Sequence, residues 1–99
     1  MHATDTTLFV IARITAKPGH VSTVRDAIMA ILAPTRAEAG CIRYDALSDN
    51  GNDHCFVIQE QWQSKAALND HMLTEHFKIL VDCIGPIASI EISELSLLA

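Results

Sequence analysis

Residues 41–63 read CIRYDALSDNGNDHCFVIQEQWQ and carry the clearest fold signal in the chain. Their centre, Asp49-Asn50-Gly51-Asn52-Asp53, is dense in turn-forming residues, and Asn-Gly is the strongest short signal for a β-hairpin. The flanking runs 41–48 and 55–63 therefore predict two antiparallel strands. Their exact register stays open, because the loop between them is longer than two residues.

The N-terminal side of this hairpin predicts one further strand and one helix. Residues 7–15, TLFVIARIT, are rich in β-branched and aromatic residues, which is typical of a strand. Pro18 suits the first turn of a helix, and apolar residues then recur at helical spacing. Because Gly40 is a natural stop, we expect a helix over residues 19–39, kinked or tightened at Pro34.

The C-terminal side predicts a broken helical segment and a last strand. Ser64 and Thr74 are both suited to cap short helices, the first of which runs through Met72. Gly85-Pro86 ends the second helix. Residues 87–97 then alternate between apolar and polar side chains, which indicates a strand.

The predicted order is β-α-β-β-α-β, the ferredoxin-like α+β arrangement. Helices can cover only one face of such a sheet. Both faces of the strand 7–15 carry apolar residues, with Leu8 and Val10 on one face and Phe9 and Ile11 on the other. The simplest solution is a homodimer in which two sheets pack face to face and form a barrel-like core.

Length, charge and cysteine usage narrow the class of protein. The chain has 99 residues, which predicts a single domain over residues 1–99. Its formal net charge of −5 disfavours nucleic acid and anionic membranes as partners. No apolar run approaches the roughly 20 residues of a membrane span, and Met1-His2-Ala3-Thr4-Asp5 does not look like a signal peptide. Cys41, Cys55 and Cys83 form no pairing motif, so we expect reduced thiols in a cytoplasmic protein.

Four short patterns occur in an order that resembles a known family. Together, and over nearly the whole chain, they resemble the antibiotic biosynthesis monooxygenase (ABM) family, which includes quinol monooxygenases. The resemblance implies a dimeric α+β barrel with a pocket in each subunit, between the sheet and the helices. The patterns are Ala12-x-Ile14 leading to Lys17-Pro18-Gly19, EAGCIRY at 38–44, EQWQSKAAL at 60–68, and His71-x-x-Thr74-Glu75-His76-Phe77.

The resemblance implies a choice between several chemistries. Some members oxygenate quinols and polycyclic phenols without a cofactor, whereas others degrade haem or isomerise a phosphorylated signalling sugar. The haem-degrading branch has an asparagine just before the arginine of its first strand and a haem-ligating histidine in its last helix. Here Trp62 matches a tryptophan of that branch, but Ala12 and Val81 stand at or near the other two positions, which disfavours haem binding.

His71 and His76 are the candidate catalytic bases. They lie five residues apart, which is about 140° around a continuous helix, so they would not share a face. A break at Thr74 would let both approach one cavity. Neutral imidazole, with a pKa of about 6.5, suits the removal of a phenolic proton, and the resemblance makes one of the two the candidate base. The alternative is a helix-capping or surface role for each.

Five further residues are candidates for binding the substrate. Trp62 could form one wall of a flat aromatic site, and Glu60 lies two residues earlier on the same strand face. A carboxylate there is expected to be paired or to have a raised pKa, and an ion pair with Arg13 or Arg43 is the favoured interpretation. Packing in the core or at an interface is the alternative for the aromatic residues. The candidate set is Trp62, Tyr44, Phe77, Glu60 and Arg13.

The sequence contains no H-E-x-x-H motif, no paired cysteines and no nucleotide-binding glycine loop, so we expect neither a metal nor a cofactor.

The leading hypothesis is a cofactor-independent monooxygenase that uses molecular oxygen on a small quinol-like or other electron-rich aromatic ligand. One alternative is a non-catalytic small-molecule binding or detoxification module. Another is an isomerase of a phosphorylated signalling sugar, for which Arg13, Arg43 or Lys78 would have to bind the phosphate.

Overall fold

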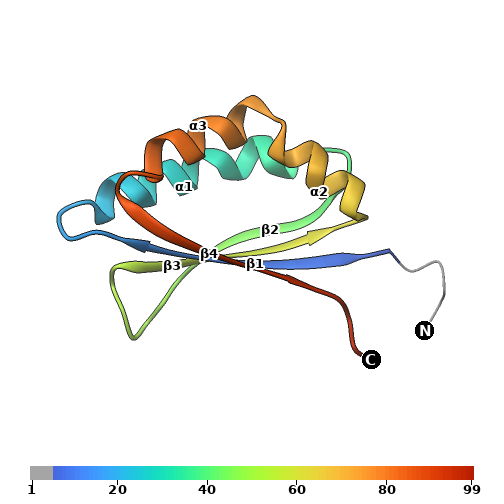
Figure 1. The fold of residues 1–99 in the computed structure, drawn as a ribbon, viewed down its shortest axis with the longest axis horizontal. Coiled ribbons are helices and arrows are strands. Elements are labelled where there is room, and N and C mark those ends of the chain that lie inside the picture. The colour runs from blue at the N-terminus through green and yellow to red at the C-terminus, as the bar shows by residue number, and fades with distance from the viewer. Residues whose placement is uncertain (1–5) are drawn as a thin grey trace.

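The computed structural model describes residues 6–99, and its elements follow the predicted order (Figure 1). The expectation about a signal peptide falls on residues 1–5, which lie outside the described residues. The strands are β1 (Leu8–Ala16), β2 (Cys41–Ser48), β3 (Cys55–Trp62) and β4 (Ala88–Leu95). The helices are α1 (Val21–Arg36), α2 (Lys65–Met72) and α3 (Glu75–Ile84).

The sheet has the strand order β2-β3-β1-β4, and each pair of neighbours is antiparallel. β1 and β2 therefore run in the same direction with β3 inserted between them, which confirms the ferredoxin-like α+β fold. The hairpin register is now defined, because Ser48 lies opposite Phe56 and Tyr44 lies opposite Glu60. An irregularity between Cys41 and Arg43 interrupts this ladder near the start of β2.

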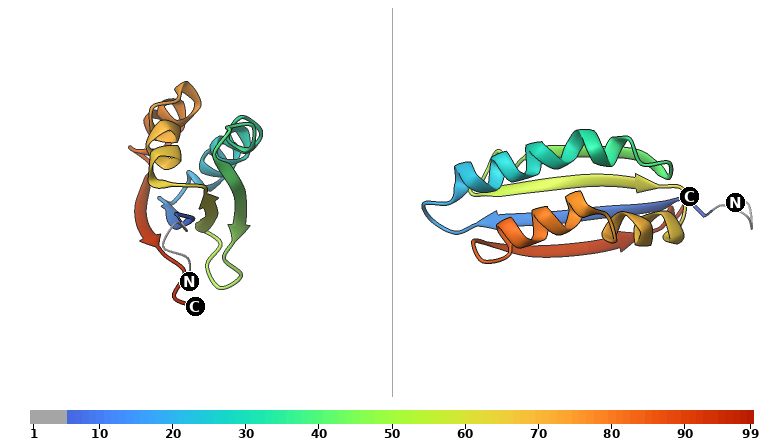
Figure 2. Two further views of the ribbon diagram at one scale, coloured as in Figure 1. Left: turned by 90° about the vertical axis from the view of Figure 1, so that its right-hand side faces the viewer. Right: turned by 90° about the horizontal axis from the view of Figure 1, so that it is seen from above.

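All three helices lie on one face of the sheet, as Figures 1 and 2 show from three directions. Burial along β1 follows this arrangement, because Leu8, Val10, Ala12, Ile14 and Ala16 are buried beneath the helices. The core of the molecule is therefore the layer between the sheet and the helices, and it also contains the site described below.

None of the helices within residues 6–99 covers the opposite face of the sheet. On β1 it carries Phe9 and Ile11, which are partly exposed, and Arg13, which is exposed. Val57 on β3 lies opposite Arg13 and is also partly exposed. This mixed apolar and polar surface is the face on which the homodimer prediction rests.

Two element boundaries differ from the sequence prediction. The first helix covers Val21–Arg36 and is therefore shorter than the predicted range 19–39. It continues past Pro34 and is followed by a loop over residues 37–40. The last strand ends at Leu95, and its alternating apolar residues Ile90 and Ile92 are 38% and 64% exposed because β4 is an edge strand. No helix within residues 6–99 has both the length and the apolar character needed to cross a membrane.

Candidate active site

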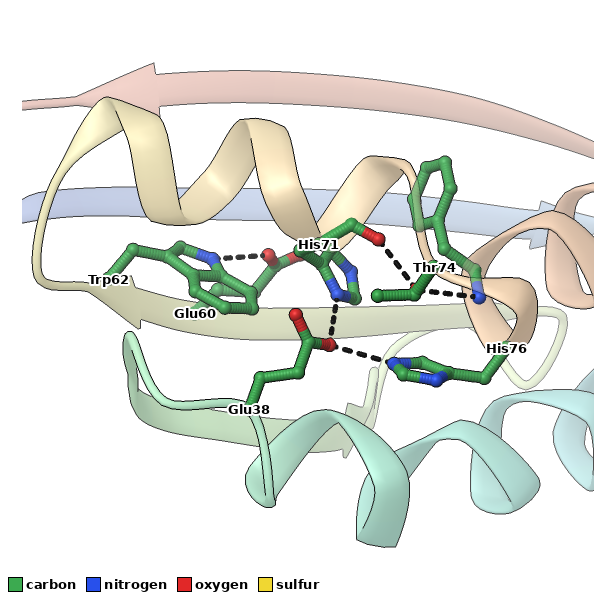
Figure 3. A network of polar contacts seen from close by, with 7 residues as sticks. Glu38, Glu60, Trp62, His71, Thr74 and His76 are labelled. Atoms are coloured by element: carbon green, nitrogen blue, oxygen red, sulfur yellow. Dashed lines mark hydrogen bonds and ion pairs between the residues drawn. The ribbon is translucent and has the colours of Figure 1, made fainter.

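Two histidines meet at one carboxylate in the layer between the sheet and the helices. Nδ1 of His71 and Nε2 of His76 each lie 2.7 Å from the same oxygen, Oε2 of Glu38 (Figure 3). His71 comes from α2, His76 from α3 and Glu38 from the loop between α1 and β2. We call these three residues the Glu38 cluster.

The break between α2 and α3 makes this meeting possible. Thr74 caps α3 by accepting a hydrogen bond from the backbone N–H of Phe77 at 3.2 Å. Its hydroxyl also donates a hydrogen bond to the backbone carbonyl of His71 at 2.7 Å, which connects the start of α3 to the end of α2. The predicted break at Thr74 is confirmed, and it brings His71 and His76 to one carboxylate from different helices.

His71 is held as a neutral imidazole. Its side chain is only 2% exposed, and burial lowers its pKa, although the neighbouring Glu38 opposes this shift. An ionised carboxylate only accepts hydrogen bonds, so Nδ1 of His71 carries the ring proton in its contact with Glu38. Nε2 is then the unprotonated nitrogen, which is the form a general base needs.

Glu60 is buried and has an unexpected partner. Trp62 donates its indole N–H to Oε1 of Glu60 at 2.9 Å, within one strand and on one strand face. Burial raises the pKa of Glu60 to about 7, with a further increase from the charge of Glu38, while the Trp62 hydrogen bond opposes the shift. At neutral pH this carboxyl group therefore exchanges readily between its acid and its base form.

The predicted ion pair of Glu60 with Arg13 or Arg43 is wrong. Arg13 lies on the helix-free face of the sheet, where it binds Asp49 at 3.1 Å and contacts Sγ of Cys55 at 2.9 Å. Arg43 pairs with Asp45 at 2.9 Å. Strand alternation explains the difference, because Glu60 lies opposite the buried Val10 and so points to the helical side. The structure thus places Arg13 apart from the other candidate site residues.

Aromatic side chains surround His71. Its ring centroid lies 4.7 Å from that of Trp62, 5.0 Å from that of Phe77 and 5.6 Å from that of Tyr44. Tyr44 and Trp62 are buried, and burial raises the pKa of the Tyr44 hydroxyl, so it stays protonated. The structure therefore brings together every candidate site residue except Arg13.

A cavity lies beside His71, between the sheet and the helices α2 and α3. Its volume is about 200 Å³, and Lys65 and Glu94 line its solvent-exposed edge, where they form an ion pair of 2.8 Å. A smaller hollow of about 70 Å³ shares Glu60, Phe77 and Ile92 with it and reaches Tyr44. We call the larger hollow the inner cavity; the residues that line it include Val10, Glu60, Leu68, His71, Phe77 and Ile92.

The Glu38 cluster is the group within residues 6–99 whose donor atoms could hold a metal ion, since they lie within 4.8 Å of one another. Zinc bonds of about 2.1 Å in tetrahedral geometry would hold the donor atoms roughly 3.4 Å apart. The observed distances of 2.7 Å are those of hydrogen bonds. We therefore describe the cluster as hydrogen-bonded. Ala12 and Val81, which line the smaller hollow, have no side-chain atom that could ligate haem iron.

Glu38 is the functional candidate that sequence reasoning missed. It lies within the EAGCIRY run, but 33 positions before His71 and 38 positions before His76 in the sequence. The nearest sequence feature is Gly40, two residues later, but the reason for this glycine is visible only in the structure. A Cβ atom at Gly40 would collide with Cβ of Ala67 on α2, so only glycine lets the loop that carries Glu38 approach this helix.

The fold and the site together define a class of small ferredoxin-like proteins with a histidine-lined cavity between sheet and helices. The sequence profile named Antibiotic biosynthesis monooxygenase matches residues 7–82. The chain belongs to this family.

Known relatives agree with this assignment. The crystal structure of PA3566 from Pseudomonas aeruginosa has a TM-score of 0.91 at 40% identity and covers 100% of both chains. The structure of Rv0793 from Mycobacterium tuberculosis has a TM-score of 0.90 at 28% identity, over 95% of this chain and 97% of that one.

Curated sequences give the same family at partial coverage. The protein named "Putative monooxygenase Rv0793" is 37% identical over 68 residues, which are 69% of this chain and 66% of that protein. The protein sll1783 from Synechocystis is 31% identical over 78 residues, which are 79% of this chain and 53% of that protein. The chain thus matches between about half and two thirds of the length of these two relatives.

Proposed function

We propose that the protein is a cofactor-independent monooxygenase of a quinol or a related electron-rich phenol, with His71 as the general base. The observation that carries this proposal is the position of His71. It is buried, its pKa is lowered, Glu38 holds its Nδ1, and its ring lines the inner cavity. Monooxygenase names among the relatives support the reaction class.

The reaction begins with a proton transfer. A phenolic hydroxyl has a pKa of about 10 by analogy with tyrosine, so at neutral pH it needs a base to ionise. Nε2 of His71 takes the hydroxyl proton, and the resulting phenolate is a stronger electron donor to molecular oxygen. General-base assistance of this kind contributes a factor of about 10²–10⁴ to the rate.

The overall reaction balances without a cofactor. Hydroquinone and molecular oxygen give hydroxybenzoquinone and water. One oxygen atom forms a bond to a ring carbon through a peroxide, and the O–O bond then breaks. The other oxygen atom leaves as water after taking up protons, one of which His71 returns. The four electrons that reduce oxygen come from the oxidised ring.

The lining of the inner cavity suits a flat neutral phenol. Phe77, Leu68 and Ile92 provide apolar walls, and Glu60 provides a polar group among them. With a pKa of about 7, Glu60 can donate a hydrogen bond as an acid or accept one as a base. A phosphorylated sugar has less support, because Lys65 is the cation of the cavity lining and already pairs with Glu94.

Oxygen consumption tests the proposal. We expect the wild-type protein to consume oxygen with hydroquinone faster than hydroquinone autoxidises, and His71→Gln to reduce this rate by about 10²-fold or more. His54→Gln is the matched control, since His54 is a half-exposed histidine that pairs with Asp53 outside the site. Stabilisation by aromatic ligands without oxygen consumption would instead identify a non-catalytic binding module.

We also propose that the protein acts as a homodimer in the cytoplasm. The helix-free face of the sheet, with Phe9 and Ile11 partly exposed, supports the dimer. The three cysteines are free thiols, which supports a reducing compartment.

A further inference from the structure

The Glu38 cluster connects two hollows on different sides of the helical layer. His71 lines the inner cavity and its side chain is 2% exposed. His76 lines a separate groove of about 280 Å³ between α1 and α3, and its side chain is 25% exposed. Ala27, Ile79 and Cys83 also line this outer groove. Glu38 lies between the two rings, with one oxygen in hydrogen-bond contact with both.

We propose that Glu38 and His76 form a proton path between the catalytic base His71 and the outer groove. The proposal rests on the function proposed above and adds roles for two residues that do not line the inner cavity. In this arrangement a ligand that fills the inner cavity does not block the exchange of protons with water, because the path opens on the other side of the helices.

Every proton released by one group along the path is taken up by the next group or by water. When Nε2 of His71 takes the phenolic proton, Nδ1 can release its own proton to Oε2 of Glu38. In this step His76 carries protons on both ring nitrogens: its Nε2–H stays hydrogen-bonded to Oε2 of Glu38, and its Nδ1 releases a proton to water as Glu38 takes up the proton from His71. When His71 later gives its Nε2 proton to the peroxide, the transfers run in reverse and restore the proton at Nδ1. Over the cycle the path therefore neither gains nor loses a proton.

Both contacts are short enough for proton transfer along a hydrogen bond. Both contacts are 2.7 Å, at the short end expected for a charge-assisted hydrogen bond between nitrogen and oxygen. A purely structural role, in which Glu38 simply holds α2 and α3 together, would use the same contacts. A proton path and a purely structural contact make different predictions for a variant without His76. Only for the path should an added base such as imidazole restore the rate of proton exchange or turnover.

The first test needs no substrate. The exchange of the His71 ring N–H proton with water is followed by NMR in the wild type, in His76→Gln and in the control His54→Gln. If the path exists, His76→Gln slows the exchange about tenfold or more, because the amide cannot relay a proton. Equal exchange rates in all three proteins would overturn the proposal.

The second test uses turnover. In His76→Ala, the kcat for oxygen consumption with hydroquinone is expected to fall about tenfold or more at low buffer concentration and to recover when imidazole is added, with KM unchanged. A loss that imidazole does not restore would show a structural role and overturn the path. If the wild type consumes no oxygen, the proposed function fails, and the exchange measurement still decides whether the path exists.

Discussion

The position of Glu60 on the buried side of β3 changes the pKa of its carboxyl group. The same carboxyl group on the other face of β3 would be exposed and ionised at neutral pH. On the helical side it is 7% exposed and accepts a hydrogen bond from Trp62, and its pKa rises to about 7. A buried group of this kind destabilises the fold once it must carry charge.

This shift predicts how stability depends on pH. The folded protein binds the Glu60 proton more tightly than the unfolded chain, whose pKa is close to 4.5, so stability falls as the pH rises from about 4.5 to above 7. At pH 8 we expect Glu60→Gln to increase the free energy of unfolding by on the order of 2–3 kcal/mol. Urea denaturation at pH 5 and pH 8 measures this difference.

Comparing the stability of Glu60→Gln with that of the wild type at two pH values tests whether Glu60 is the titrating group. Its gain over the wild type should disappear at pH 5, where the wild-type carboxyl group is already protonated when folded. Because the amide of the introduced glutamine keeps an acceptor for Trp62, packing changes little. A gain of the same size at both pH values would show that Glu60 does not titrate as described.

His71 predicts a second pH effect, this time on catalysis. The base must be unprotonated, and its pKa lies below the usual 6.5, so kcat/KM should fall only as the pH drops below that value. The titratable groups that face it are Glu38, His76, Glu60 and Tyr44. Oxygen consumption is measured from pH 5 to 8 in the Glu60→Gln background, which removes the titration of Glu60, whose pKa is about 7. A fall centred above pH 7 in that background would argue against His71.

At the scale of elements, the break between α2 and α3 determines the geometry of the site. The hydroxyl of Thr74 both caps α3 and bonds to the last turn of α2. Without this second contact the two helices would each remain capped, but their relative position would be less constrained. The caps also explain why two short helices were predictable from sequence, since Ser64 and Thr74 are local signals.

We expect Thr74→Ala to lower the free energy of unfolding by about 1–2 kcal/mol and to reduce oxygen consumption as well, because His76 moves relative to Glu38. Ser64→Ala is the matched control, since it removes the cap of α2 but leaves the connection between the histidines intact. Thr74→Ser should restore both properties. Equal loss of activity in the Ser64 and Thr74 variants at equal stability would contradict this account.

Gly40 gives a packing prediction at the same scale. A side chain at this position would collide with Ala67, so Gly40→Ala should destabilise the fold by about 1–3 kcal/mol. The double variant Gly40→Ala/Ala67→Gly removes the colliding methyl group and should recover part of the loss. Thermal unfolding of the three proteins tests this, and a double variant no better than the single one would contradict it.

Local signals predicted most of the fold but only part of the site. Strand composition, Asn50-Gly51 and the helix caps act over a few residues, so the element order was correct. Glu38 and its histidines are brought together only by the tertiary fold, and sequence spacing carries no trace of that contact. The ion pair expected for Glu60 failed because it required knowing which face of the sheet each charged residue occupies.

At the scale of the whole molecule, the helix-free face of the sheet is the surface proposed for the dimer contact. Phe9 and Ile11 on β1, with Val57 on β3 and Leu47 on β2, give it an apolar centre flanked by charged and amide side chains. A surface of this composition suits the stable contact of two copies, provided that the interface is large enough.

We therefore expect a homodimer at micromolar concentration, and Ile11→Asp should convert it into a monomer by placing a charge in the apolar centre. Light scattering measures both masses. Ile79→Asp on α3 is the matched control, since Ile79 is an exposed isoleucine on the helical side and its change should leave the mass unaltered. A monomeric wild type would contradict the dimer.

The ion pair of Lys65 and Glu94 at the edge of the inner cavity has a consequence for selectivity. Because the two charges of this ion pair offset each other, Lys65 does not act as a free cation at the edge of the cavity. In the proposed reaction, discrimination among phenols is then expected to depend on how well their shape fits the apolar walls of the inner cavity.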